Sequence, residues 1–489
     1  MSNLQYLQIL QLAAPEAIVT LTLLIVLAAD LTLLRGKSIA TRFHAGGLIS
    51  VLGCVAAAAF ALTRHVTSDP CSGLLMVTPQ SDFVKVALLG LTVFTVMIST
   101  AGKFTDHVGE YLSLLLLGTV GLMFLVSTED LLMIFIALEF ASLSLYILAA
   151  FNKHDVKSSE AALKYFLFGG MSAAFLLFGF SLLYGFSGST NLAEIARSLA
   201  GKGLDPLLLI AIVTTVIGFG FKVAAVPFHL WAPDAYEGAP TPSAAFIGSG
   251  SKVASFYVLA KILTLGFAGV EGSAHWQGYL SGWTPVVAIV AALSMVLGNL
   301  TAIVQSSVKR LLAYSAIAHA GYMLLGVVAN TSAGAGGMLF YVITYAATTI
   351  GAFGVVMVVE EATGGDAIVN FAGLSRRAPV LSLCLLVFLL SLGGIPPLAG
   401  FIGKFFLFSA VVIADGQHLG LLWLVILAIA MSAVSFYYYL LVLKQAYVRD
   451  AAENAPVIQV PPVTLLALVL LAGLIILVGC VPSLLTQFL

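Results

Sequence analysis

The chain has 489 residues, of which 61% are apolar and 9% are charged, and its mean hydropathy is +1.09. A typical soluble domain carries about 25% charged residues, so this composition excludes a soluble enzyme and predicts an all-α polytopic membrane protein, whose helices satisfy their own backbone groups in lipid. The net charge of −1 provides no basic surface for nucleic acid.

The four cysteines are scattered along the sequence without a CxxC pair. We therefore expect no disulfide and no metal site. Three of them lie in apolar segments and are predicted to fill the core: Cys54, Cys384 and Cys480. The N-terminus lacks a basic region before its first long apolar stretch, so no cleaved signal peptide is expected.

Apolar stretches of about 20 residues, the length that crosses a bilayer core, predict fourteen membrane spans. In chain order they cover 15–34, 44–62, 82–100, 111–127, 131–151, 160–185, 206–226, 241–266, 284–304, 308–328, 335–359, 380–414, 421–447 and 462–481.

Two of these spans carry residues that interrupt a helix. The seventh runs up to Pro227, which lacks a backbone donor and cannot continue an α-helix. The twelfth is longer than a bilayer requires and contains Gly393, Gly394, Pro396 and Pro397. Both spans are therefore predicted to be broken helices.

The distribution of basic residues predicts the orientation in the membrane, because cytoplasmic loops are rich in lysine and arginine. Loops after odd-numbered spans carry Arg35, Lys37, Arg42, Lys103, Lys153, Lys157, Lys309, Arg310, Arg376, Arg377, Lys444 and Arg449. Loops after even-numbered spans carry Arg64, Arg197 and Lys202. This bias places both termini on the non-cytoplasmic side.

The two broken spans lie five spans apart, and each has a lysine beside its break, Lys222 and Lys404. An odd offset means that the two units have opposite topology, and inverted repeats with broken helices are typical of transporters. The predicted organisation is an N-terminal addition of three helices (1–110), a first five-helix repeat (111–270), a second, inverted repeat (271–450) and a C-terminal helix (451–489).

Four charged residues lie near the middle of predicted spans: Glu139, Lys222, Lys252 and Lys404. A lysine at the bilayer centre costs about 2.5–3.5 kcal/mol on insertion scales. Burial disfavours an ammonium group and a neighbouring carboxylate favours it, so a lysine that faces a movable acid can take up and release a proton. These residues therefore predict a proton pathway, with a purely structural buried pair as the alternative.

The positions of the lysines suggest an order along this pathway. Lys222, near the C-terminal end of one half-helix, is expected to be favoured when charged, whereas Lys404, near the start of another, is expected to be disfavoured. Lys252 would bridge the two halves. His319 in the tenth span would pass protons near neutral pH, or it is a satisfied core histidine.

Other ionisable residues near the membrane have weaker indications. Lys85 is predicted to reach an interface with its long side chain. Lys164 and Lys261 lie toward the ends of their spans, where the same behaviour and a functional role are about equally expected. His229, just after Pro227, is a further candidate for the pathway. Tyrosines, including Tyr437–Tyr439, are expected to be packing or lipid-facing groups.

Four motifs resemble one known family of membrane proteins. They are EAALKYFLFG (160–169), VPFHLWAPDAYEGAPTP (226–242), KRLLAYSAIAHAGYMLLG (309–326) and GIPPLAGFIGK (394–404). They are similar to the antiporter-like membrane subunits of respiratory complex I, a family that also includes the multisubunit cation/proton antiporters. The resemblance covers roughly residues 110–450 and is greatest to the N-type subunit. The chain ends after span fourteen, without the lateral helix of the L type, and has Lys404 where the M type has glutamate.

The resemblance implies proton translocation coupled to quinone reduction elsewhere in a complex. By position, Glu139 matches the acid of the fifth helix, Lys222 its ion-pair partner, Lys252 the central lysine and Lys404 the lysine on the exit side; His319 lies in the motif of the tenth helix. The chain itself would hold no cofactor, whereas NADH, FMN, iron–sulfur clusters and quinone would be bound by partner subunits. Those partners would include a second antiporter-like subunit and small helical subunits.

The first three spans, which a shortened animal homologue lacks, favour a bacterial protein of the plasma (inner) membrane. Two other functions share these sequence features. One is a subunit of a multisubunit sodium/proton antiporter, and the other is a scaffold that only holds neighbouring subunits together.

Overall fold

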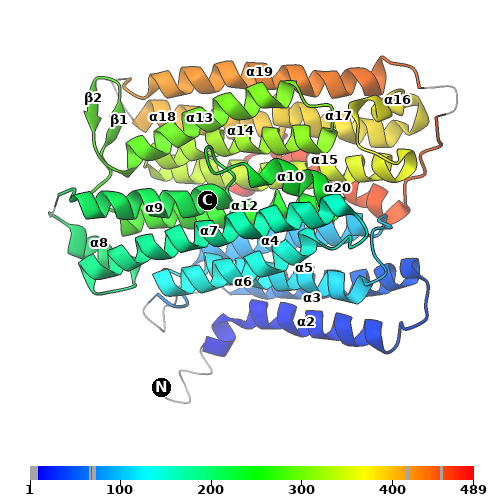
Figure 1. Cartoon of the computed structure of the whole chain (residues 1–489), viewed down its shortest axis with the longest axis horizontal. Coiled ribbons are helices and arrows are strands. Elements are labelled where there is room, and N and C mark those ends of the chain that lie inside the picture. Colours follow the sequence, from blue (N-terminus) through cyan, green and yellow to red (C-terminus); the bar gives the residue numbers. More distant parts are fainter. Residues whose placement is uncertain (1–8, 65–67, 69–72, 202, 415–418, 452–454) are drawn as a thin grey trace.

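The structure is a computed structural model of the whole chain, and it describes all residues except 1–8, 65–67, 69–72, 202, 415–418 and 452–454. Long helices run side by side along one direction (Figure 1). In the described part, twelve helical segments are long and apolar enough to cross a membrane, and three shorter apolar helices accompany them. The predicted all-α membrane fold is confirmed.

In the first half of the chain, the helices are α2 (Ala14–Leu31), α3 (Ile39–Thr63), α4 (Pro79–Ser99), α5 (Val108–Val126), α6 (Leu131–Ala149), α7 (Val156–Ser187), α8 (Leu192–Leu199), α9 (Pro206–Lys222) and α10 (Trp231–Gly238). The long helices and α9 lie at the predicted spans, whereas the short helices α8 and α10 lie between them.

The remaining elements continue this bundle after α10. They are α11 (Thr241–Ile247), α12 (Gly250–Lys261), a π-helical turn η1 (Ile262–Gly266), a hairpin of β1 (Ser273–His275) and β2 (Gly278–Leu280), α13 (Trp283–Ile303), α14 (Val308–Val328), α15 (Ser332–Thr363), a 3₁₀ turn η2 (Ile368–Phe371), α16 (Leu374–Arg377), α17 (Pro379–Gly393), α18 (Ala399–Ala414), α19 (Leu422–Tyr447), α20 (Pro462–Cys480) and α21 (Ser483–Thr486).

Both predicted helix breaks are confirmed, and each has a residue of positive φ. Helix α9 ends at Lys222, and Ala224 (φ +58°), in the loop before α10, takes the left-handed conformation usual at helix ends. Helix α17 ends at Gly393, and Gly394 (φ +87°) closes it. A side chain at Gly394 would be strained by this φ, and its Cβ would lie 3.0 Å from Cδ of Lys404.

The structure also contains features that hydropathy does not reveal. The predicted span 241–266 is divided at Gly248 and Ser249 into α11 and α12. Ser249 has φ −122° and ψ −77°, which are not helical angles. Cys54 and Cys384 are buried as predicted, but Cys480 is exposed at the end of α20, so its prediction as a core residue was wrong.

Two helix pairs have the same local construction. Helices α7 and α15 each contain 32 residues and end at a left-handed glycine, Gly188 and Gly364. The residue before α6, Asp130, forms an isolated β-bridge with Asn191, which follows α7. In the same way, the residue before α14, Ser307, forms one with Ala367, which follows α15. These features agree with an internal repeat, whose boundaries stay a prediction.

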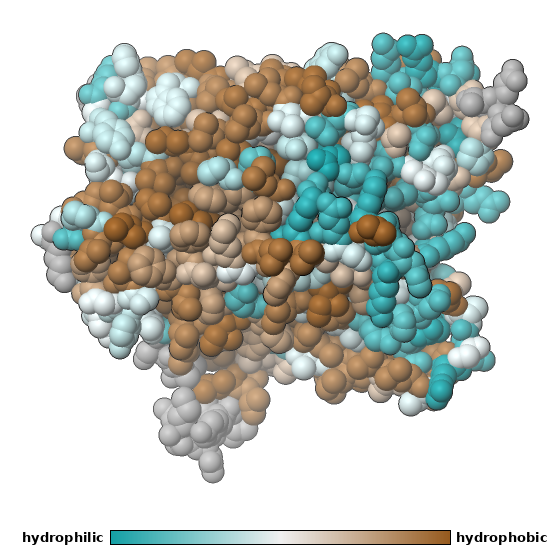
Figure 2. All heavy atoms as spheres, viewed as in Figure 1, coloured by the Kyte–Doolittle hydropathy of each residue, from teal (hydrophilic) through white to brown (hydrophobic). Residues whose placement is uncertain are grey.

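Hydrophilic residues are unevenly distributed on the surface. Figure 2 shows apolar residues over most of one face and hydrophilic residues toward the end of the molecule that carries α16, with an extension into the middle of the face. This end carries the loops after odd-numbered spans, which are predicted to be cytoplasmic.

Lys85 lies in the protein interior, so the prediction that it reaches an interface was wrong. Its side chain on α4 is 0% exposed, and Nζ lies 2.7 Å from a carboxylate oxygen of Glu16 on α2. Asp82 on α4 is 3.8 Å away and forms a second ion pair with Arg64. The pair with Glu16 lets the ammonium lie among apolar helices, because a buried charge is tolerated when it is paired.

We expect Glu16→Gln and Lys85→Met, each alone, to lower the free energy of unfolding by roughly 3–5 kcal/mol, since each leaves one buried charge without its partner. The double variant Glu16→Gln/Lys85→Met should regain most of that loss. Thermal melting of the purified protein in detergent measures all three. Additive losses in the double variant would contradict a mutually compensating pair.

Candidate functional site

Glu139 and Lys222 form an ion pair between α6 and α9. Their charged atoms are 3.5 Å apart, and the side chain of Lys222 is 4% exposed whereas that of Glu139 is 24% exposed. Lys222 also donates hydrogen bonds to Ser142 Oγ (2.6 Å) and Tyr146 O–H (3.3 Å). The ammonium therefore has neutral acceptors that can hold it when Glu139 moves away, which a switchable pair requires.

Lys252 lies on α12 in the centre of the bundle and is 1% exposed. Its Nζ donates to the backbone carbonyl of Ala316 on α14 (2.6 Å) and lies 5.6 Å from the ring centre of Tyr345 on α15. Ala316 lies about one helical turn before His319 on α14, so Lys252 contacts α14 close to His319.

His319 is fully buried and hydrogen-bonded through both ring nitrogens. Nδ1 lies 2.7 Å from the hydroxyl of Tyr341 on α15, and Nε2 lies 3.1 Å from the hydroxyl of Tyr439 on α19. A neutral imidazole has one donor and one acceptor nitrogen, and a tyrosine hydroxyl can serve either. A proton can thus arrive on one side of the ring and leave on the other.

Lys404 lies on α18, but its ammonium reaches back across the break. Nζ donates to the carbonyls of Leu392 (3.0 Å) and Gly393 (3.1 Å) at the end of α17, and to Ser432 Oγ on α19 (2.7 Å). A helix C-terminus stabilises a positive charge. The long side chain places the ammonium at the end of α17 rather than at the start of α18, where the sequence predicts it. The expected effect on the charge of Lys404 stays a prediction.

A cluster of buried tyrosines connects the central residues, and sequence reasoning missed it. Lys404 Nζ lies 5.1 Å from the ring centre of Tyr322, whose hydroxyl bonds with Asn299, and Asn299 accepts a hydrogen bond from Tyr438. Tyr438 and Tyr439 are fully buried rather than lipid-facing. Only Tyr437 of that run is exposed.

The predicted central residues form two groups rather than one continuous chain of bonds. Lys252, His319 and Lys404 share the polar cluster of α14, α15 and α19. Glu139 and Lys222 lie together beside it, and within the described residues no direct hydrogen bond joins this pair to Lys252. Transfer between the two groups therefore needs water or a side-chain movement.

The remaining candidates lie at the margins of the bundle. Lys261 pairs with Glu129 (2.9 Å) at the far end of α12. His229 lies half-buried in the loop between α9 and α10. Lys164 is 38% exposed and contacts Glu160 (2.6 Å) and Asp234 (2.7 Å).

Lys164 belongs to a network that joins three helices. Arg310 on α14 donates to Asp234 and Glu237 on α10 (2.8 Å each), and Lys157 on α7 also contacts Glu237 (3.0 Å). Arg310, through Nη1, thus ties the short helix after the break to the second half of the chain.

No group of three or more His, Cys, Asp or Glu side chains that could hold a metal ion occurs in the described ranges. What the arrangement can do chemically is move protons, because it contains buried amines and an imidazole that each contact hydroxyl or carbonyl groups.

Residues 128–435 match the family described as NADH:quinone oxidoreductase/Mrp antiporter, transmembrane. NADH-quinone oxidoreductase subunit N 2 of Acidobacterium capsulatum is 52% identical, and the match covers 100% of both chains. NADH-quinone oxidoreductase subunit N of Desulforamulus reducens is 44% identical over 79% of this chain and 78% of its own.

Solved structures of the same family and of related complexes have a similar fold. A chain of respiratory complex I from Thermus thermophilus with bound aureothin matches with a TM-score of 0.78 and 32% identity, covering 97% of this chain and 98% of that chain. A chain of the Mrp complex from Dietzia matches with a TM-score of 0.79 at 20% identity, over 98% of this chain and 96% of its own, which shows a shared fold alone.

We expect Arg310→Met to lower the free energy of unfolding by roughly 2 kcal/mol, because two carboxylates on α10 lose charge-assisted hydrogen bonds. Arg376→Met is the matched control, since its pair with Asp450 is 77% and 76% exposed and such pairs contribute about 0–1 kcal/mol. Chemical denaturation in detergent compares the two. Equal losses would contradict the expectation that the hydrogen bonds of Arg310 stabilise the fold more than an exposed ion pair does.

Proposed function

The chain belongs to the NADH:quinone oxidoreductase/Mrp antiporter transmembrane family, and from this premise we propose that it is the N-type, proton-translocating membrane subunit of a bacterial NADH:quinone oxidoreductase. Full-length similarity to a relative of that name supports the assignment. The observation that carries the transport function is the set of buried basic groups inside the bundle: Lys222, Lys252, His319 and Lys404.

In this function each basic group accepts and releases a proton in turn. While Glu139 is near, Lys222 keeps its charge; when the pair opens, the ammonium loses its only carboxylate among the described contacts and its proton is released toward Lys252. His319 and its two tyrosines then connect Lys252 with the region of Lys404. Lys404 delivers the proton to the far side.

The energy scale of the pair suits this task. Moving one proton against about 150 mV costs roughly 3.5 kcal/mol before any pH difference is added. Separating a buried charge from its partner costs about 3–5 kcal/mol. Opening or closing the Glu139–Lys222 pair is therefore on the scale needed to drive one transfer.

The proposal includes a translocase role without a redox centre in this chain. NADH, FMN, iron–sulfur clusters and quinone are assigned to partner subunits of the complex. The partners in the membrane are other complex I subunits, among them a second antiporter-like subunit and small helical subunits. The proposed location is the bacterial plasma membrane, with both termini on the non-cytoplasmic side. The distribution of basic loop residues supports this orientation.

We expect Lys222→Ala and Glu139→Ala to reduce NADH-driven proton pumping while the complex still assembles, because both variants remove the switchable pair. The complex purified with each variant, reconstituted in liposomes, gives pumped protons per NADH oxidised. Lys37→Ala, a change of an exposed loop lysine, is the control and should pump as the unmodified complex does.

The alternatives give different results in the same assay. Sodium-driven proton flux without NADH would identify a sodium/proton antiporter subunit. A scaffold would show altered stability and unchanged pumping when all four of Glu139, Lys222, Lys252 and Lys404 are neutralised. Normal pumping by an assembled Lys222→Ala complex would contradict the proposed pathway.

Tyr439→Phe is expected to lower pumping, since it removes only the hydroxyl that bonds His319 Nε2. Tyr437→Phe, two residues away with a side chain that is 55% exposed, is the matched control and should have no effect. Turnover and proton uptake by the two reconstituted complexes make the comparison. If both variants behave alike, the His319–Tyr439 contact has no part in transfer.

A further inference from the structure

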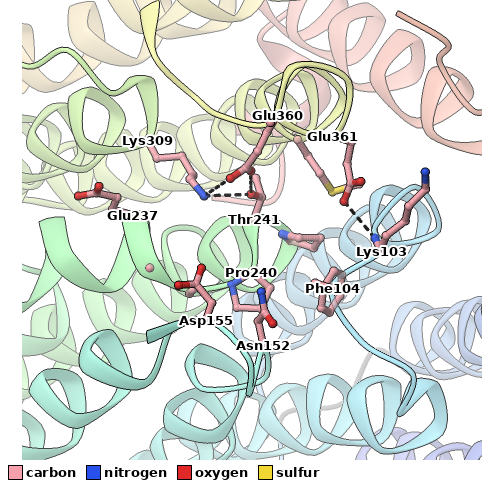
Figure 3. Close-up of a pocket in the computed structure, with 15 residues that line it drawn as sticks. Lys103, Phe104, Asn152, Asp155, Glu237, Pro240, Thr241, Lys309, Glu360 and Glu361 are labelled. Carbon is pink, nitrogen blue, oxygen red and sulfur yellow. Dashed lines mark hydrogen bonds and ion pairs between the residues drawn. The ribbon is translucent and has the colours of Figure 1, made fainter. Parts of the chain in front are cut away.

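A pocket of about 330 Å³ opens at the end of the molecule where α11 begins and α15 ends (Figure 3). Its lining includes Thr241 at the start of α11, Lys309 at the start of α14 and Glu360 near the end of α15. All three lie on the side predicted to be cytoplasmic. The pathway described above begins deep in the bundle and does not use this pocket.

Inside the pocket these three residues form a closed set of contacts. Lys309 is 7% exposed and donates to one oxygen of Glu360 (2.7 Å) and to the hydroxyl of Thr241 (3.5 Å). The hydroxyl of Thr241 donates to the other oxygen of Glu360. Figure 3 shows Glu360 and Lys309 meeting above Thr241. Glu360 keeps 30% of its side chain exposed, so one carboxylate touches both solvent and the first residue of α11.

From this point α11 and α12 lead to Lys252 along α15. Thr241 contacts Glu360, and Lys252, eleven residues later, lies over the ring of Tyr345. Both contacts are with α15, so α15 runs beside α11 and α12 on either side of their joint at Gly248 and Ser249. The seam between α11–α12 and α15 therefore joins the pocket to the central lysine.

A buried hydroxyl without a hydrogen-bond partner lies beside this seam. Within the described residues, Tyr236 O–H has no partner, and its side chain is 0% exposed. The hydroxyl of Tyr236 lies 3.1 Å from the Cβ position of Gly248, at the joint of α11 and α12, and its ring packs on Phe353 of α15. A buried hydroxyl without a partner costs about 1–3 kcal/mol, so the position of Tyr236 favours water along the seam.

We propose that Glu360 is the carboxylate that takes up protons at this pocket and that the α11–α12/α15 seam conducts them to Lys252. A proton from bulk water binds a carboxylate oxygen of Glu360, and the resulting carboxylic acid releases it to water in the seam. Tyr236 relays the proton by accepting one and donating its own, and Lys252 in its amine form accepts it as an ammonium. This inference rests on the proposed function, and it adds a second supply of protons to Lys252 beside the one from Lys222.

Three other carboxylates line the pocket, and each accepts a hydrogen bond from another residue. Glu237 is held by Lys157 and Arg310. Asp155 accepts the backbone N–H of Lys157 at the start of α7. Glu361 accepts the backbone N–H of Lys103 at the outer edge. Among the described carboxylates that line the pocket, Glu360 alone contacts α11.

The test uses the whole complex reconstituted in liposomes and measures pumped protons per NADH oxidised. Glu360→Gln should lose part of the pumping that Lys252→Met loses, and Glu360→Asp should restore some of it. Glu361→Gln, the adjacent residue in the same pocket, is the matched control and should pump normally. Tyr236→Phe, which removes one hydroxyl, should lower pumping without changing assembly.

The outcomes separate this inference from the proposed function. Normal pumping by Glu360→Gln together with loss in Lys252→Met would overturn the role of Glu360 and leave the proposed function standing. Normal pumping by both would overturn both. If Glu360→Gln fails to assemble because Lys309 loses its partner, Glu360→Gln/Lys309→Met replaces it; low pumping by that complex supports the inference, and normal pumping overturns it.

Discussion

The structure depends on how each ammonium group inside the bundle is compensated. Burial of a charge is tolerated only when pairing and hydrogen bonding offset its lost hydration. Lys85, Lys222, Lys261 and Lys309 each lie beside a carboxylate. In the part of the chain that the structure describes, Lys252 and Lys404 have no carboxylate within ion-pair distance and are held by carbonyls, a hydroxyl and ring faces.

The paired lysines and the lysines held by neutral groups suit different steps of proton transfer. A lysine beside a carboxylate responds to the position of that carboxylate, so it suits the points where movement or uptake controls the charge. A lysine held by neutral groups keeps most of its contacts when it becomes an amine, since an amine still donates to a carbonyl. Lys252 and Lys404 are thus groups that exchange protons at small structural cost, and the paired lysines are groups whose partners set the direction.

Hydropathy and helix-breaking residues were enough to predict the spans and both breaks, because a bilayer fixes helix length and because Pro227 and the Gly/Pro run at 393–397 cannot continue a helix. They were not enough to predict pairing. Glu16 and Lys85 are 69 positions apart and meet only in the folded bundle. Glu360 and Lys309 lie at span ends, where each looks like a loop charge. The roles of Tyr438 and Tyr439 depend on which face of α19 turns inward, and an apolar helix without a polar side gives no such signal.

The hydrogen bonds of Lys404 at the joint between α17 and α18 determine what must change there when this lysine loses its proton. An ammonium has three donors, and here all three are used, on Leu392, Gly393 and Ser432. An amine has two donors and one lone pair. The two carbonyls can only accept, so the serine is the partner that must reverse, turning its own hydrogen toward the nitrogen. A rotation of one hydroxyl therefore absorbs the change of charge, and the half-helices can keep their places while the proton comes and goes.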